Sequence, residues 1–141
     1  MSAAISKHGL IKFEIKESAY NAVMFGEFID SLKVQLESMN IDTGKFILDN
    51  ASIHRSKLVS DKLLGTEFEL VFLPAYSPQL NPIEETFSKW KNIIKVENCN
   101  TIDELKGCIS VASGRITKDD CIKYFSHVRK YILKGIRRGD F

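Results

Sequence analysis

The chain has 141 residues, of which 44% are apolar and 27% charged, and its net charge is +2. These values are typical of a single globular domain and exclude wholesale disorder. No apolar run approaches the roughly 20 residues that cross a bilayer, and the N-terminus lacks the pattern of a secretory signal, so we expect an intracellular protein without membrane association.

The three cysteines, Cys99, Cys108 and Cys121, are an odd number and contain no closely spaced pair. Disulfide frameworks in small domains normally use an even number of cysteines, and reducing compartments keep thiols reduced. The sequence therefore predicts reduced thiols.

The first half of the chain alternates strand and helix patterns. Residues 2–6 are short and apolar, residues 10–15 alternate with period two, and Lys7-His8-Gly9 between them supplies a turn, which together indicate a β-hairpin. Apolar residues at helical spacing from Phe25 to Leu36 indicate an amphipathic helix. The expected elements are strands at 2–6 and 10–15, a helix at 21–39, a strand at 45–50 and a helix at 55–64.

The second half begins with one more strand and then becomes helical. Three prolines between residues 74 and 82 exclude a helix or central strand there, and Pro82 suits the first turn of the next helix. We expect a strand at 67–73 and helices at 83–96, 102–113 and 118–133. This order predicts an α/β fold in which the last two strands pair in parallel, because a helical crossover joins them.

Two carboxylates stand where α/β folds place their functional sites. Asp49 ends the strand at 45–50, and Glu84 lies in the first turn of the helix after the proline-rich loop. We expect the intervening helix and strand to return Glu84 to the sheet edge that carries Asp49, where both would share a hard cation such as Mg²⁺. The alternative is local: Asp49 would cap the next helix, and Glu84 would favour the helix dipole.

Two motifs give a specific resemblance. Residues 46–54, FILDNASIH, resemble the D-N-A-x-x-H segment of mariner-superfamily DDE transposases, and residues 73–84, LPAYSPQLNPIE, resemble that family's L-P-x-Y-S-P-x-L-N-P-I-E block. The 34 residues between Asp49 and Glu84 are a spacing that the superfamily uses. The helix that follows departs from the family pattern, since Phe87 stands where Trp is usual and Trp90 where a smaller apolar residue is usual.

The resemblance implies a ribonuclease H-like mixed sheet with flanking helices, which cuts and rejoins DNA at transposon ends with Mg²⁺ or Mn²⁺. By their places in the motifs, Asp49 and Glu84 are the second and third catalytic carboxylates and metal ligands. His54 matches the motif's histidine, and we favour a packing or hydrogen-bonding role for it. Three lysines are candidates for contacts with the DNA backbone, with a solvated helix face as the alternative: Lys89, Lys91 and Lys95.

In the family, a first catalytic Asp lies on a central strand before the segment that matches residues 2–6. We therefore expect residues 1–141 to form a partial catalytic domain, without that strand and without the helix-turn-helix region that reads transposon ends. Glu14, Asp30 and Asp42 are in the wrong places to substitute for the first carboxylate. The expected consequences are little activity of the chain alone, unpaired strand edges, marginal stability and self-association, including a homodimer.

Three functions stay open at this point. The first is a transposase-derived catalytic domain acting on transposon and target DNA, in a nucleus or a bacterial cytoplasm. The second is a repurposed nucleic-acid-binding or protein-interaction module without catalysis. It would use a basic surface such as the segment from Lys118 to Phe141, whose seven Lys or Arg against three Asp either meet phosphates or form a solvated face. The third, an unrelated α/β protein, is disfavoured by the proline-rich block.

Overall fold

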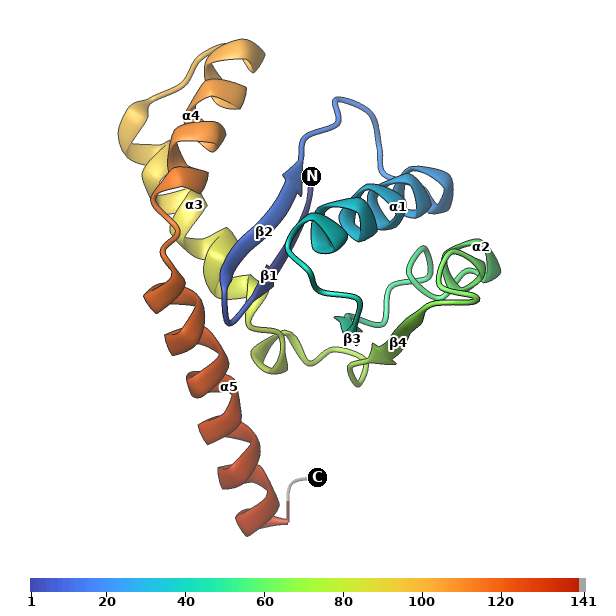
Figure 1. The fold of residues 1–141 in the computed structure, drawn as a ribbon. Coiled ribbons are helices and arrows are strands. Elements are labelled where there is room, and N and C mark those ends of the chain that lie inside the picture. The colour runs from blue at the N-terminus through green and yellow to red at the C-terminus, as the bar shows by residue number, and fades with distance from the viewer. Residues whose placement is uncertain (140–141) are drawn as a thin grey trace. The chain divides into compact units, whose positions relative to one another are not determined.

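The computed structural model describes residues 1–139 (Figure 1). The predicted order of strands and helices is confirmed throughout. The elements are β1 (Ser2–Ser6), β2 (Gly9–Glu14), α1 (Ala22–Ser38), β3 (Thr43–Leu48), α2 (Lys57–Asp61), β4 (Glu67–Phe72), the 3-10 turn η1 (Pro78–Leu80), α3 (Ile83–Glu97), α4 (Ile102–Gly114) and α5 (Lys118–Arg138). None of the helices among these residues is long and apolar enough to cross a membrane.

Most boundaries lie within two residues of the sequence prediction, such as β3, which is shifted two residues earlier than 45–50, but the ends of two helices differ by more. Helix α2 has only five residues, because its N-cap is Ser56, whose side chain accepts a hydrogen bond from the Val59 N–H, and the chain after Asp61 continues as turns. Helix α5 runs to Arg138, five residues beyond the predicted end, and stops at Gly139 in the left-handed conformation (φ 74°). Glycine adopts that conformation without steric cost, so it ends helices efficiently.

The strands form two separate pairs. β3 and β4 are parallel, with Phe46 opposite Leu70 and Leu48 opposite Phe72, which confirms the predicted crossover. β1 and β2 pair with each other, and their two-residue connection requires them to be antiparallel. In the described part of the chain the two pairs share no hydrogen bonds, so each of the four strands has one unpaired edge.

The chain divides into two compact units. Unit 1 comprises Met1–Ala4 and Ile11–Asn81, and its core is the apolar side of α1. Side chains from both strand pairs pack against that core, and the rings of Phe46 and Phe68 stack at 5.0 Å. The buried core residues are Phe25, Phe28, Ile29, Leu32, Leu36, Val59 and Leu63. This packing fixes β3 and therefore the segment that follows it.

Unit 2 comprises Ile5–Leu10 and the chain from Pro82 onward, and it is mainly helical. Helices α4 and α5 both start with a capping box, formed by Thr101 with Glu104 and by Thr117 with Asp120. Each box satisfies two N–H groups that the first turn of a helix otherwise leaves unpaired. The buried side chains of this unit include Thr86, Trp90, Ile109, Ala112, Ile116 and Cys121.

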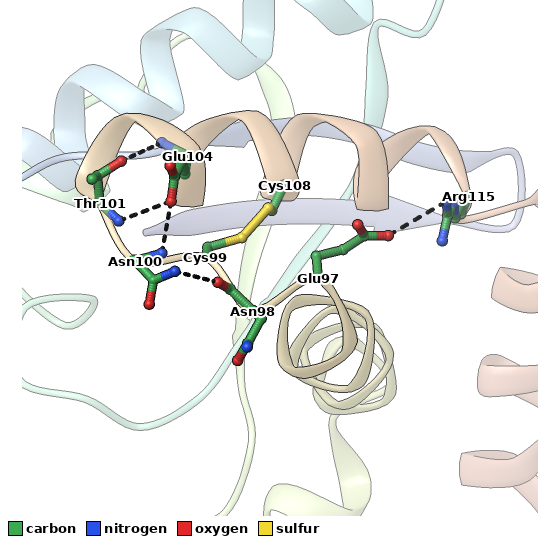
Figure 2. Close-up of a disulfide and its surroundings, with 8 residues drawn as sticks. All are labelled: Glu97, Asn98, Cys99, Asn100, Thr101, Glu104, Cys108 and Arg115. Carbon is green, nitrogen blue, oxygen red and sulfur yellow. Dashed lines mark hydrogen bonds and ion pairs between the residues drawn. A yellow bond between two sulfur atoms is a disulfide. The ribbon is translucent and has the colours of Figure 1, made fainter.

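The prediction that all cysteines are reduced is wrong for one pair. Cys99 and Cys108 form a disulfide, whereas Cys121 is free and buried (Figure 2). Asn98 ends α3 in the left-handed conformation (φ 55°), and the short link that carries Cys99 then lies beside the second turn of α4. A spacing of nine residues gives no sign of this pairing, because the proximity arises only from the turn between the two helices.

Candidate functional site

Asp49 directly follows β3, and its side chain is 54% exposed. Its Oδ1 accepts a hydrogen bond from the Ala51 N–H at 3.1 Å and lies 2.6 Å from Nδ1 of His54. The alternative that Asp49 caps the next helix is wrong, since Ser56 is the cap of α2. Both contacts involve Oδ1, which leaves Oδ2 for another ligand.

His54 connects this carboxylate to the core of unit 1. Its side chain is only 17% exposed, and its ring lies against that of Phe25, with ring centroids 4.1 Å apart. Its backbone N–H donates to the Ala51 carbonyl at 3.1 Å, which closes the turn after Asp49. The favoured role of His54, packing or hydrogen bonding, is confirmed in both respects. The contact of Phe25 with the His54 ring was not predicted, because the helical spacing of Phe25 identifies it only as a core residue.

Glu84 lies on the exposed side of the first turn of α3. The proline-rich loop leads into this turn, with Leu80 of η1 buried as its anchor and Pro82 as the N-cap of α3. Glu84 and Glu85 are both acidic residues in that turn, where carboxylates favour the helix dipole. Because the Glu84 side chain is exposed, it can interact favourably with the helix dipole and also bind a metal ion.

The three candidate lysines of α3 lie on two different sides of the helix. Lys91 and Lys95 follow Glu84 by seven and eleven residues, about two and three helical turns, so they share its exposed side. Lys89 lies on a different side of α3, where its ammonium donates hydrogen bonds to Asp120 at 2.7 Å and to the Arg115 carbonyl at 2.8 Å. Its ammonium is thus engaged within unit 2.

The Lys89 contact has a clear electrostatic consequence. Its ammonium, with a smaller contribution from the Thr117 N–H, lowers the pKa of the Asp120 carboxyl to about 2. One turn further toward the start of α3, Glu85 pairs with His127 of α5. Neither pair was predicted, because the partners are 31 and 42 residues apart and no local pattern reports such contacts.

Asp49 and Glu84 belong to different compact units, and their sharing of one cation stays a prediction. Carboxylate oxygens are the donors that Mg²⁺ and Mn²⁺ prefer, so both residues suit such an ion chemically. Among residues 1–139 no group of three or more His, Cys, Asp or Glu side chains is arranged to hold a metal. The described residues thus supply two carboxylates of suitable chemistry.

The fold is that of a mariner transposase catalytic domain, which confirms the predicted ribonuclease H-like α/β class. The Mos1 transposase catalytic domain with raltegravir and Mn matches with a TM-score of 0.76 and 19% identity, over 91% of this chain and 67% of that one. A crystal structure of the Mos1 mariner catalytic domain gives 0.75 and 19%, over 91% and 66%. The Mos1 paired-end complex with the left transposon end gives 0.73 and 20%, over 91% and 38%.

The model of the DDE superfamily endonuclease family matches residues 1–106. The chain therefore belongs to the DDE superfamily endonucleases, and the resemblance to mariner-type DDE transposases is confirmed. It spans about two thirds of the matched Mos1 catalytic domains and about 38% of the chain in the paired-end complex. No curated protein matches it.

Proposed function

We propose that this chain is the catalytic portion of a transposase that cuts and joins DNA strands during transposition and integration. The family match over residues 1–106 supports this most strongly, because it includes both motif carboxylates. The matched Mos1 structures include a paired-end complex with a transposon end and a strand transfer complex. By analogy, the partners of this chain are transposon-end and target DNA.

Asp49 and Glu84 are the proposed metal ligands and catalytic carboxylates. A bound pair of Mg²⁺ or Mn²⁺ ions would activate the attacking hydroxyl and stabilise the leaving oxygen. Asp49 offers Oδ2 for this purpose while Oδ1 is held by Ala51 and His54. Glu84 offers an exposed carboxylate in the first turn of α3.

Low activity of the isolated chain is part of this proposal. Two-metal sites normally need a third acid to bridge the ions, and residues 1–139 hold no arranged group of three ligands. A further protein segment that carries an acid would bring in the third ligand. A homodimer is the proposed assembly of the catalytic portion. The proposed setting is a nucleus or a bacterial cytoplasm.

Metal binding and nicking test the assignment separately. Mn²⁺ added to the isotope-labelled chain should broaden the amide signals around Asp49 and Glu84 at lower concentration than those elsewhere. D49A and E84A should abolish the broadening at their own sites, whereas E67A, which removes an exposed acid of β4, should leave both intact. Nicking of supercoiled DNA with Mn²⁺, however weak, should disappear in D49A and E84A. Broadening and nicking unchanged by both substitutions would refute the assignment.

The second candidate is a DNA-binding module without catalysis. The lack of a three-ligand group in the described residues favours it. It predicts DNA binding in EDTA, no nicking with any divalent ion, and no effect of D49A or E84A on binding.

A further inference from the structure

Helices α3 and α5 run in opposite directions beside each other within unit 2. Lys89 meets Asp120 near the start of α5, and Glu85, one turn nearer the start of α3, meets His127 farther along α5. Residue numbers therefore increase in opposite directions along the two helices, which means that α3 and α5 are antiparallel. The pairing places His127 level with the first turn of α3.

The last part of α5 extends past the start of α3. Since His127 is level with Glu85, the residues from about 130 to 138 continue beyond the turn that carries Glu84 (Figure 1). At 1.5 Å per residue this extension is about 13 Å long. We call residues 130–138 the arm.

The arm belongs to a strongly cationic helix face. Between Cys121 and Arg138 the sequence has six Lys or Arg and no Asp or Glu. Four of these cations share one side of α5, and each has an exposed side chain and no ion pair in the described chain: Lys123, Lys130, Lys134 and Arg137. This side is opposite the one that carries the buried Cys121 and Gly135.

The cationic side of α5 and the Glu84 side of α3 face the same way. On α3 the buried residues Thr86 and Trp90 lie opposite the side that carries Glu84, Lys91 and Lys95. With α5 placed beside α3 by the Lys89 and Glu85 pairs, helical geometry puts the buried sides of both helices together. The two cation-bearing sides then form one solvent-facing surface.

We propose that this surface is a track for the phosphate backbone of duplex DNA, with Glu84 near its middle. Lys91 and Lys95 lie on one side of Glu84 along the track, and Lys130, Lys134 and Arg137 of the arm lie on the other. From Lys95 to Glu84 is about 16 Å along α3, so with the arm the track is roughly 30 Å long. That length spans about nine base pairs. The proposal rests on the proposed function, because it positions DNA on the residue assigned to metal.

Charge decides between the possible occupants. A phosphate backbone complements a face on which Lys and Arg outnumber the acids Glu84 and Asp119. An anionic membrane would instead take the apolar side of α5, where Ile132 and Ile136 are 38% and 61% exposed, and that side faces away from Glu84. DNA is therefore the occupant that uses the same face as the site.

The test uses the whole chain and a mixed-sequence duplex of about 20 base pairs, in EDTA, with binding followed by fluorescence anisotropy at several salt concentrations. K130Q/K134Q should lower the slope of log affinity against log salt by about 2, as expected for two lost phosphate contacts. K91Q/K95Q should have a similar effect, and the fourfold variant should approach the sum. The matched control K7Q/K12Q removes the same charge from the β1–β2 hairpin and should leave the slope unchanged.

Equal slopes for K130Q/K134Q and K7Q/K12Q would overturn the proposal. Loss of binding to phosphatidylserine vesicles by I132S/I136S, with DNA binding insensitive to K130Q/K134Q, would also overturn it and assign α5 to a membrane surface. Because the assay contains no divalent metal, it is independent of catalysis. Normal salt slopes together with Mn²⁺ broadening and nicking that D49A and E84A leave unchanged would refute the proposed function and leave the track intact.

Discussion

His54 Nδ1 lies 2.6 Å from Oδ1 of Asp49, and the His54 ring rests on Phe25 in the core of α1. The candidate metal ligand is thereby connected to the buried core of unit 1 by a single side chain. The Ala51 N–H donates to the same oxygen, so two donors fix the carboxylate and Oδ2 stays open. Removing a group that orients a metal ligand in this way commonly changes the metal affinity by roughly 10- to 100-fold.

Substitutions at His54 separate its two roles. H54F keeps a ring against Phe25 but removes the donor, and H54N keeps a donor near the position of Nδ1 but removes most of the ring. We expect H54F to weaken Mn²⁺ binding at Asp49 about tenfold or more, measured by the broadening of nearby amides, and H54N to restore part of the affinity. H54F with the affinity of the unmodified chain would show that the contact does not position the ligand.

Lys89 should matter for stability rather than for DNA. K89M removes the donor of a part-buried hydrogen bond to Asp120 and of an exposed one to the Arg115 carbonyl, so it should lower the free energy of unfolding by about 1 kcal/mol in urea titrations. K91M on the exposed side of α3 should change it by less than about 0.5 kcal/mol. For the slope of log DNA affinity against log salt we expect the opposite order, with a larger change in K91M than in K89M. A larger loss of stability in K91M than in K89M would contradict this division.

The same pair predicts a loss of stability in acid. Lys89 lowers the pKa of Asp120 from an ordinary 3.8 to about 2 in the folded chain. Because the folded-state value is the lower one, the stabilisation is fully present above about pH 4 and is lost as the pH falls towards 2. The stability difference between the unmodified chain and D120N, followed by urea unfolding, should be constant from pH 7 to 5 and shrink below pH 4. A difference that is unchanged at pH 2.5 would exclude a charged Asp120 as its cause.

The Cys99–Cys108 disulfide should respond to reduction without loss of the helices. Opening a loop of this size is expected to lower stability by roughly 2–3 kcal/mol through the entropy of the unfolded chain. The capping box of Thr101 and Glu104 stays in place, so far-ultraviolet circular dichroism should change little. Dithiothreitol should lower the melting temperature of the unmodified chain but not of C99S/C108S. In a reducing compartment the dithiol form is the expected one.

Thr86 offers a test of polar burial in unit 2. Its side chain is fully buried, and its Oγ1 has no hydrogen-bond partner in the described chain. A buried hydroxyl without a partner is costly, so the nearly isosteric T86V should raise the free energy of unfolding by about 1 kcal/mol. T86S keeps the hydroxyl and removes a methyl group, and it should lower stability. A destabilising T86V would indicate that Oγ1 has a partner such as a buried water.

The order of elements, the family and the motif positions of Asp49 and Glu84 follow from the sequence alone. They are encoded locally, in apolar periodicity, in turn residues and in the irregular proline-rich block. The sequence also indicated correctly that His54 packs or makes a hydrogen bond, although it did not identify the partners.

Only the tertiary structure decided which partners distant residues take. The sequence gives no reason to distinguish Lys89 from Lys91 and Lys95. In the structure Lys89 pairs with Asp120, 31 residues later, whereas the other two lie on the exposed side of α3. Cys99 and Cys108 meet for a similar reason, because a left-handed Asn98 turns the link along α4. Such contacts depend on how helices fold back on one another, and no local pattern in the sequence records that. For Asp49, the motif defined a candidate ligand, and packing through His54 onto Phe25 decided how its carboxylate is held.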